Sequence, residues 1–295
     1  MGFRAMLEKR QKEAKTLVCV GLDPLGDKLP DCMRVGDDVA QNIRVWMTKI
    51  ADATAPFASM FKPQRAHWEA IRGGEQALRE LVTIIHEKHP GIPVFGDCKR
   101  GDIGRTQQQY RKAHLDLDGF NGMNFSPYMG RDCMSGLVDK KSPGRALVGL
   151  CYTSNPDARE VQDVKLADGR CYWEFIAERT LAWAKELGVA EDAGLVMAAA
   201  YELPPKGSGQ VYAEHLRRCR QIVGNSLWFL IPGVGAQKGA VAETVRYAYA
   251  GPGSIAINSS SEIDFASSGE DFAEAAAKKA MELRDAINLA LPQTA

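Results

Sequence analysis

The sequence predicts an α/β fold, a single-domain (β/α)8 barrel that spans residues 1–295. Eight short runs are apolar almost throughout, which is typical of parallel strands buried on both faces. Helical patterns lie between these runs, and no shift in composition divides the chain. The alternative is an open doubly wound sheet, but the turn VGLDPLGDKLP after the first run lacks the G-x-G-x-x-G pattern expected there.

The predicted elements alternate along the chain. Strands are expected at residues 17–23, 57–63, 92–99, 119–127, 145–153, 193–200, 226–233 and 254–260. Apolar residues repeat with a helical period in residues 75–88, 173–187 and 272–287. Two polar connections, near residues 153–170 and 202–210, are unusually long. Both follow strands at the C-terminal face of a barrel, where a long loop is commonly a lid or a binding loop; a tolerated insertion is the alternative for the second.

Composition and charge exclude several classes of protein. Of the 295 residues, 45% are hydrophobic and 25% charged, which excludes long disorder, collagen and coiled coil. Lys plus Arg and Asp plus Glu both number 37, and this balance argues against nucleic acid or an anionic membrane as a partner. The seven cysteines are scattered and form no C-x-x-C pair, which favours reduced thiols. The chain also shows no signal peptide and no apolar run of bilayer length, so we expect a soluble, cytoplasmic protein.

Polar and charged residues stand at the ends of the predicted strands, where barrels carry their active sites. They are Asp23, Lys62, Asp97, Lys99, Ser126, Gln237 and the run Ser259–Ser260–Ser261. A single charge at a strand end is commonly just solvated. The convergence of four charges on one barrel mouth therefore indicates a functional site.

The segment GDCKRGDIGRT carries the strongest signal. Asp97 and Lys99 are two apart on a strand, so their side chains are expected on the same face, while Cys98 faces the helices and is a poor nucleophile candidate. Asp102 either caps the following helix or completes, with Lys62, an array of alternating charge. Neighbouring carboxylates keep a lysine protonated in apolar surroundings, and a fixed ammonium can give a proton to a strongly basic carbon.

The D-x-K-x-x-D-I-x-x-T pattern within this segment resembles the signature of the orotidine 5′-phosphate decarboxylase family. Further motifs of the family are matched in order by VGLDP (20–24), FKPQ (61–64), SPYMG (126–130), TSNP (153–156) and PGVGAQKG (232–239). KPQ, SPY and TSNP are similar to motifs of its longer, bacterial-type branch. The resemblance implies a (β/α)8-barrel carboxy-lyase that converts orotidine 5′-phosphate to uridine 5′-phosphate and CO2, the last step of de novo UMP synthesis, with no metal or organic cofactor.

The resemblance also implies a role for each charged residue. Lys99 matches the family's proton donor to C6 of the pyrimidine, and Asp97 matches the carboxylate that faces the departing carboxyl group. Lys62 matches the other lysine of the array, which reaches the ribose. Asp102, with Thr106 beside it, matches an aspartate that the family contributes across a homodimer interface to the partner's site. The implied partners are a nucleotide substrate and a second copy of the chain.

The remaining implied contacts hold the substrate. Asp23 matches the ribose-binding aspartate, Ser126 matches the serine that contacts the base, and Gln237 matches the glutamine over the phosphate. Backbone N–H groups of the glycine-rich PGVGAQKG segment, including that of Gly235, also suit a phosphate.

One departure from the family pattern concerns that phosphate. The family branch places an arginine after the serines of the last strand, whereas here the run reads INSSSEI, with Ser260 followed by Ser261 in the arginine's place. Both serines are expected at the phosphate, so the clamp is expected to be weaker or to borrow a cation such as Lys238.

Two alternatives remain open from the sequence. A magnesium-dependent sugar-phosphate synthase or epimerase of the same barrel superfamily would also use the Asp-x-Lys-x-x-Asp segment, but it needs a carboxylate at the end of the second strand, where this chain has Lys62. A barrel that binds a pyrimidine nucleotide without turnover is the other alternative. The intact charged array argues against it, and Ser261 is the feature that favours it.

Overall fold

The computed structural model describes residues 1–203, 208–233 and 238–292, and it confirms the predicted barrel. Eight parallel strands form one sheet in the order β2-β1-β10-β9-β6-β5-β4-β3. Their bounds are β1 (Val18–Gly21), β2 (Met60–Lys62), β3 (Phe95–Arg100), β4 (Gly122–Phe125), β5 (Ala146–Tyr152), β6 (Gly194–Met197), β9 (Trp228–Ile231) and β10 (Ile255–Ser259). Each predicted strand overlaps one of them, and only β3 extends past its predicted end, by one residue, because continuous apolar runs are buried on both faces of a parallel sheet.

The barrel closes between its first-listed and last-listed strands, β2 and β3. Two isolated parallel bridges join them, Phe61 to Val94 and Gln64 to Asp97. At the second bridge the N–H of Asp97 donates to the carbonyl of Pro63 at 3.0 Å. Closure therefore brings the C-terminal ends of β2 and β3 together, and with them the charged residues that the sequence places there.

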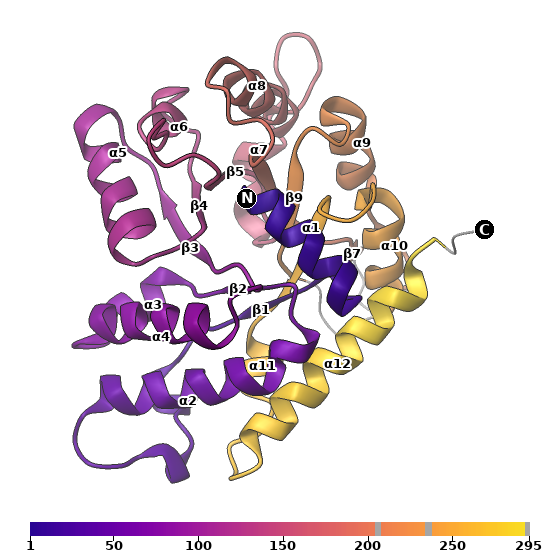
Figure 1. The fold of residues 1–295 in the computed structure, drawn as a ribbon. Coiled ribbons are helices and arrows are strands. Elements are labelled where there is room, and N and C mark those ends of the chain that lie inside the picture. Colours follow the sequence, from indigo (N-terminus) through magenta and orange to yellow (C-terminus); the bar gives the residue numbers. More distant parts are fainter. Residues whose placement is uncertain (204–207, 234–237, 293–295) are drawn as a thin grey trace.

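The helices surround the barrel, as Figure 1 shows. The longer ones are α1 (Phe3–Ala14), α2 (Val39–Thr54), α4 (Gly74–Lys88), α5 (Gly104–Arg111), α8 (Tyr172–Glu186), α9 (Glu214–Val223), α10 (Lys238–Ala248) and α12 (Phe272–Ala290). Short ones are η1 (Gly26–Lys28), η2 (Asp31–Met33), η3 (Ala55–Phe57), α3 (Arg65–Glu69), the π-helix η4 (Lys112–Leu117), α6 (Asp132–Ser135), η5 (Pro156–Ala158), α7 (Arg159–Gln162) and α11 (Ser261–Asp264). The three periodic stretches of the sequence form α4, α8 and α12, whose apolar faces pack on the sheet.

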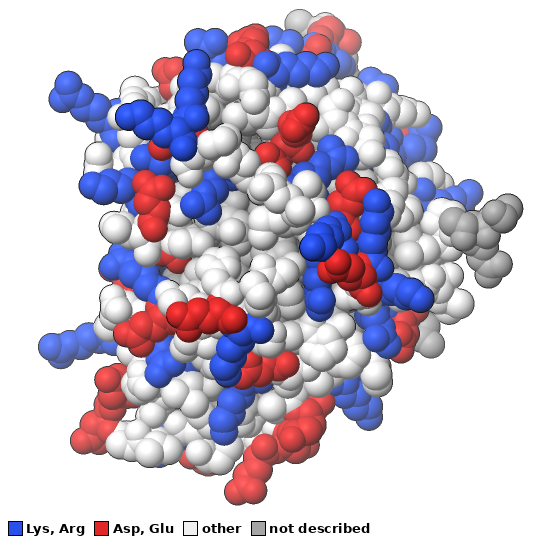
Figure 2. Space-filling view, in the orientation of Figure 1, with Lys and Arg blue, Asp and Glu red and all other residues white. Residues whose placement is uncertain are grey.

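Helix α1 covers the end of the barrel at which the strands begin, a role that the sequence did not reveal (Figure 1). Phe3 enters the apolar cluster inside the barrel and stacks on Trp228 with ring centroids 5.2 Å apart. The side chain of Gln11 donates to the carbonyl of Ile255 at 2.8 Å. Because α1 fills this end, the opposite, C-terminal end is left as the mouth. Figure 2 shows charges of both signs interspersed on the α1 face, in keeping with the balanced composition.

The two long connections contain local structure. Residues 153–170 include η5 and α7 and an antiparallel bridge between Lys165 and Cys171. The connection after β6 forms a hairpin of β7 (Tyr201–Glu202) and β8 (Val211–Tyr212), with residues 204–207 outside the described part. Among the described residues, no helix has the length and apolar character needed to cross a membrane.

Candidate active site

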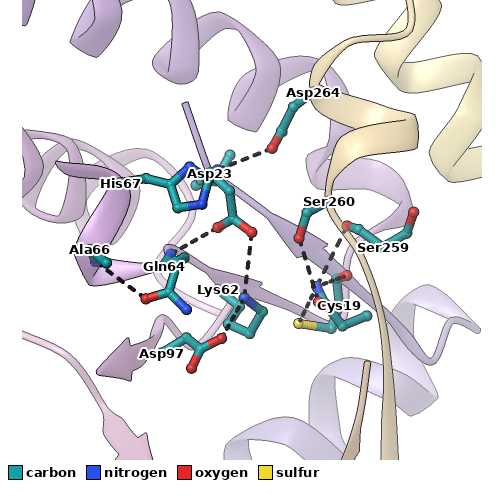
Figure 3. A network of polar contacts seen from close by, with 12 residues as sticks. Cys19, Asp23, Lys62, Gln64, Ala66, His67, Asp97, Ser259, Ser260 and Asp264 are labelled. Atoms are coloured by element: carbon teal, nitrogen blue, oxygen red, sulfur yellow. Dashed lines mark hydrogen bonds and ion pairs between the residues drawn. The ribbon is translucent and has the colours of Figure 1, made fainter. Parts of the chain in front are cut away.

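Four charged side chains meet at the mouth of the barrel, in the order Asp23, Lys62, Asp97 and Lys99. Figure 3 shows the first three of them. The Nζ of Lys62 lies 3.7 Å from Oδ2 of Asp23 and 3.2 Å from Oδ2 of Asp97. The Nζ of Lys99 lies 2.6 Å from the other oxygen of Asp97. The charges alternate in sign, so each ammonium faces at least one carboxylate.

Burial makes these charges depend on one another. The Lys62 side chain is only 3% exposed. Burial opposes its charge, but the carboxylates of Asp23 and Asp97 more than compensate and raise the pKa of Lys62. Burial likewise opposes the charge of Asp97, but Lys62, Lys99 and the amide of Asn124 hold the pKa of Asp97 well below its usual range. Lys62 and Asp97 are thus both ionised at neutral pH even though both are largely removed from water.

The end of β3 departs from regular strand geometry at Lys99. Gly96 pairs with Met123 and Arg100 pairs with Phe125, so four steps along β3 match two along β4. Lys99 has a φ of 46°, in the left-handed region that a lysine seldom adopts and that costs about 1–3 kcal/mol. Simple strand alternation predicted that the side chains of residues 97 and 99 share a face; they do meet, but at an irregular strand end that has to be held in place.

Asn124, a residue that the sequence analysis missed, holds this irregular end. It is buried in β4, and its Oδ1 accepts the backbone N–H groups of Cys98 at 2.8 Å and Lys99 at 2.6 Å. Its Nδ2 donates to Oδ1 of Asp97 at 2.6 Å. One side chain thereby fixes the backbone of Lys99 and the carboxylate of Asp97. The signal in the sequence was an asparagine inside the apolar run GFNGMNFSP.

Three members of the array, Lys62, Asp97 and Lys99, form part of the lining of a cavity of about 470 Å³. Ser126 lines this cavity beside the array, as its predicted contact with a base requires. Apolar side chains complete much of the lining: Leu150, Val161, Ile176, Val196, Leu230 and Pro232. The cavity therefore offers fixed charges on one part of its wall and an apolar surface on another.

The long connection after β5 supplies one wall of the cavity. Asn155 and Gln162 line it, together with Tyr172 at the start of α8. The side chain of Gln162 accepts the N–H of Thr153 at 2.9 Å and donates to the hydroxyl of Thr153 at 2.9 Å. This pair of hydrogen bonds ties α7 to the end of β5, so the connection is anchored over the mouth.

Asp102 and Thr106 lie apart from the array within this chain. The Oδ1 of Asp102 accepts the adjacent N–H of Ile103 at 2.8 Å, and α5 begins after Ile103 without a side-chain cap. Asp102 therefore does not cap that helix, and among the described residues it forms no ion pair. Thr106 is exposed on α5. The fourth charge of the array in this chain is Asp23 rather than Asp102.

Of the residues predicted to bind the phosphate, Ser260 and Ser261 lie at the end of β10. Ser260 follows β10 and packs against β1, where a Cβ on Gly21 would lie 2.0 Å from its hydroxyl oxygen, so only glycine fits at position 21. Ser261 begins α11 and is exposed. Gly235 and Gln237 lie outside the described residues.

The other candidate groups do not form a reactive or metal-binding centre among the described residues. Cys98 is buried on the helix side of the sheet, as predicted, and burial raises the pKa of its thiol. In the described part of the chain, no group of three His, Cys, Asp or Glu side chains is arranged to hold a metal ion. The ammonium of Lys62 occupies the space between Asp23 and Asp97 that a divalent cation would need.

Comparison with known proteins points to one family. The model of the orotidine 5′-phosphate decarboxylase / HUMPS family matches residues 16–276. Two orotidine 5′-phosphate decarboxylases, from Ralstonia nicotianae and Dechloromonas aromatica, are each 37% identical over 98% of this chain, which covers 98% and 99% of them. The solved Leishmania donovani OMP decarboxylase is similar in fold, with a TM-score of 0.74 and 28% identity over 98% of this chain and 99% of its own.

Proposed function

Because the chain belongs to the orotidine 5′-phosphate decarboxylase / HUMPS family, we propose that Lys62, Asp97 and Lys99 are the groups with which it removes CO2 from its substrate. The reaction is the decarboxylation of orotidine 5′-phosphate in UMP synthesis. The observation that carries the assignment of groups is the ion-pair array of alternating sign at the barrel mouth, in which the buried Lys62 and Asp97 hold each other ionised.

The array suits the electronic demand of this reaction. Loss of CO2 from C6 leaves an electron pair in the plane of the pyrimidine ring, where the π system cannot delocalise it. A positive charge fixed beside C6 stabilises that electron pair, and an ammonium proton can then be transferred to it. Lys99 has this role, since its Nζ is bound to Asp97 and its side chain is still 46% exposed.

Asp97 and Lys62 act on the substrate before CO2 leaves. The Asp97 carboxylate, held ionised by two lysines, repels the carboxylate of the bound substrate. This repulsion is relieved as the substrate's carboxylate becomes neutral CO2. Leu150, Val196 and Leu230 offer apolar surface that favours CO2 over a carboxylate. Lys62 keeps Asp97 ionised and also reaches the ribose.

Substrate contacts extend around the mouth from the array. Asp23 binds the ribose hydroxyls, and Ser126 hydrogen-bonds the pyrimidine. Ser260 and Ser261 lie at the phosphate, together with Gly235 and Gln237 of the PGVGAQKG segment. Phosphate binding far from C6 contributes to rate by fixing the orientation of the ring.

The working unit is a homodimer in which Asp102 and Thr106 serve the partner's site. Asp102 has no ion-pair partner among the described residues of its own chain. Apolar side chains are exposed at the residue that follows it and beside Ser126, which lines the cavity. Ile103 is 49% exposed, Tyr128 81% and Met129 46%. Apolar side chains exposed beside an active site are typical of a protein–protein interface.

The seven cysteines all carry free thiols, which supports a reducing location, the cytoplasm.

The experiment that tests this function is an assay of the purified protein with orotidine 5′-phosphate in the presence of a metal chelator. We expect loss of the substrate's absorbance with release of one CO2 for each uridine 5′-phosphate formed. Tight nucleotide binding without turnover would instead identify a binding protein. Turnover of a sugar phosphate that requires Mg²⁺ would support the synthase or epimerase alternative.

A further inference from the structure

Asp264, which the sequence analysis did not single out, is a buried carboxyl group next to the active site (Figure 3). It is the last residue of α11, directly after β10, and is 1% exposed. Its Oδ2 accepts the backbone N–H of Asp23 at 3.0 Å. Its Oδ1 is buried and has no hydrogen-bond partner within the described residues.

Asp23 connects this carboxyl group to the charged array. Its side chain accepts the N–H of Gln64 at 2.8 Å and lies 3.7 Å from the ammonium of Lys62. Asp23 follows the end of β1, and the last contact of β1 with β2 is the N–H of Leu22 to the carbonyl of Lys62 at 3.2 Å. Beyond that contact, two side chains hold the peptide unit between Leu22 and Asp23: Trp68 donates to the carbonyl of Leu22 at 3.0 Å, and Asp264 accepts the N–H of Asp23.

We propose that Asp264 is a positioning residue for substrate binding: it holds the main chain of Asp23 so that the Asp23 carboxylate faces Lys62 and the ribose. The proposal rests on the ribose-binding role assigned to Asp23 above. It adds a residue on α11 that acts through Asp23 without touching the reacting atoms.

The surroundings of Asp264 favour its uncharged form. Burial and the nearby Asp23 carboxylate raise the pKa of Asp264 well above its ordinary value, while the N–H of Asp23 and the charge of Lys62 oppose this weakly. Glu262, on the same short helix, is exposed to solvent. With Asp264 neutral, two carboxylates and two ammonium groups balance in the array, whereas an ionised Asp264 would add an unpaired negative charge.

Two substitutions separate the hydrogen bond from the charge. Asp264→Asn keeps the shape and the acceptor for the N–H of Asp23 but cannot ionise, so we expect kcat/KM for orotidine 5′-phosphate within about twofold of the wild type. Asp264→Leu removes the acceptor, and we expect KM to rise about tenfold with a smaller change in kcat, because Asp23 binds and does not react. Asp27→Asn, at an exposed carboxyl, is the matched control and should change neither constant.

Each outcome decides the proposal. If Asp264→Asn impairs KM as much as Asp264→Leu, the negative charge is what matters, and the proposal is wrong. If Asp264→Leu folds and leaves KM unchanged, the hydrogen bond to Asp23 has no role in binding. Failure of the proposed function would look different, since the wild type itself would then not turn over orotidine 5′-phosphate.

A stability measurement tests the proposal without activity, and it remains available if Asp264→Leu does not fold. A group whose pKa is raised by folding contributes stability in acid that is lost as the pH rises above its unfolded pKa, here the ordinary 3.8. We therefore expect the free energy of unfolding of Asp264→Asn, relative to the wild type, to increase from pH 4 to pH 8. A difference that stays constant over this range would show that Asp264 is ionised in the native protein, and would overturn the proposal.

Discussion

The two sides of the barrel mouth are built differently. On the side of β2, β3 and β4, the polar atoms are paired within the protein: Asp97 is bound by two lysines and by Asn124. On the side of β1, β10 and α11, Ser261 is exposed and Asp264 keeps a buried oxygen without a hydrogen bond among the described residues. The side proposed to carry the chemistry is organised before substrate arrives, whereas the side proposed to bind the phosphate and ribose is less completely paired within the described residues.

The two sides also respond to pH in opposite directions. Folding lowers the pKa of Asp97, so its contribution to stability is present at neutral pH and is lost in acid. Folding raises the pKa of Asp264, so its contribution is present in acid and is lost as the pH rises. The sign of the shift distinguishes a carboxylate that works as an anion from a carboxyl group that works as a neutral hydrogen-bonding group.

The largest effect is expected from mixing two inactive variants, Lys99→Ala and Asp102→Ala. Each should lose about 10²–10⁴ in kcat, because each removes a charge from the assembled site. If Asp102 serves the partner's site, a mixed dimer has one site with all its charges. Random exchange at equal concentrations should then restore about a quarter of the wild-type activity. No recovery despite demonstrated subunit exchange would place Asp102 in its own chain's site.

The next largest effect is expected on the binding side, from Ser261→Arg. An arginine that reaches the phosphate forms charge-assisted, bidentate hydrogen bonds worth about 1.5–3 kcal/mol, or roughly 10- to 150-fold in kcat/KM. The gain should appear with orotidine 5′-phosphate and not with the phosphate-free nucleoside. A fall in kcat/KM would indicate that a loop cation already binds the phosphate, and an equal change for both substrates would remove Ser261 from the phosphate site.

A smaller effect is expected on the organised side, from Asn124→Ala. The variant loses the acceptor for the N–H groups of Cys98 and Lys99, so the left-handed Lys99 relaxes, and kcat should fall about 10- to 100-fold with little change in KM. Asn121→Ala is the matched control. The side chain of Asn121 accepts the N–H of Val94 at 2.8 Å, so it also links β4 to β3, but at the opposite end of these strands. Equal losses in both variants would mean that strand pairing in general, rather than the position of Lys99, is at stake.

The last effect is on stability rather than on turnover: the free energy of unfolding of Asp97→Asn is expected to depend on pH differently from that of the wild type. At pH 7 this variant should be about 3 kcal/mol less stable than the wild type, because Lys62 stays buried with one carboxylate fewer. Below pH 4 the wild type loses the contribution of Asp97, so the gap should narrow towards pH 2. Chemical denaturation at pH 7 and at pH 2 measures this difference in the free energy of unfolding, and Asp37→Asn, at an exposed carboxyl group, is the control. A gap that does not change with pH would mean that Asp97 is not stabilised as an anion.

The sequence predicted the barrel because buried parallel strands leave a direct trace, an apolar run between turn residues. Helix α1 was missed as the cover of the barrel, since an amphipathic start does not show which surface its apolar face meets. The charges at strand ends were found for a physical reason, since a charge next to a buried strand is costly unless it is paired. The four charges that meet in this chain are those predicted from the strand ends, Asp23, Lys62, Asp97 and Lys99, whereas the contribution of Asp102 to a partner's site stays a prediction.

Two site residues, Asn124 and Asp264, lay beyond the sequence for the same reason. Each is a buried polar side chain with a hydrogen-bond partner on another element: Asn124 binds the backbone of β3, and Asp264 binds the backbone just after β1. Local spacing carries no trace of such partners. The left-handed backbone of Lys99 was equally invisible, because alternation along a strand assumes a regular strand. A polar residue inside an apolar run is the signal that would have drawn attention to Asn124.

The most direct measurement of the central claim, that the charged array performs the decarboxylation, is the turnover number of Lys99→Ala with saturating orotidine 5′-phosphate and a metal chelator. The wild type should release CO2 under these conditions, and the variant should be slower by at least about 10² while its thermal unfolding shows an intact fold. A variant that keeps more than about a tenth of the wild-type kcat would contradict the assignment of Lys99 as the proton donor.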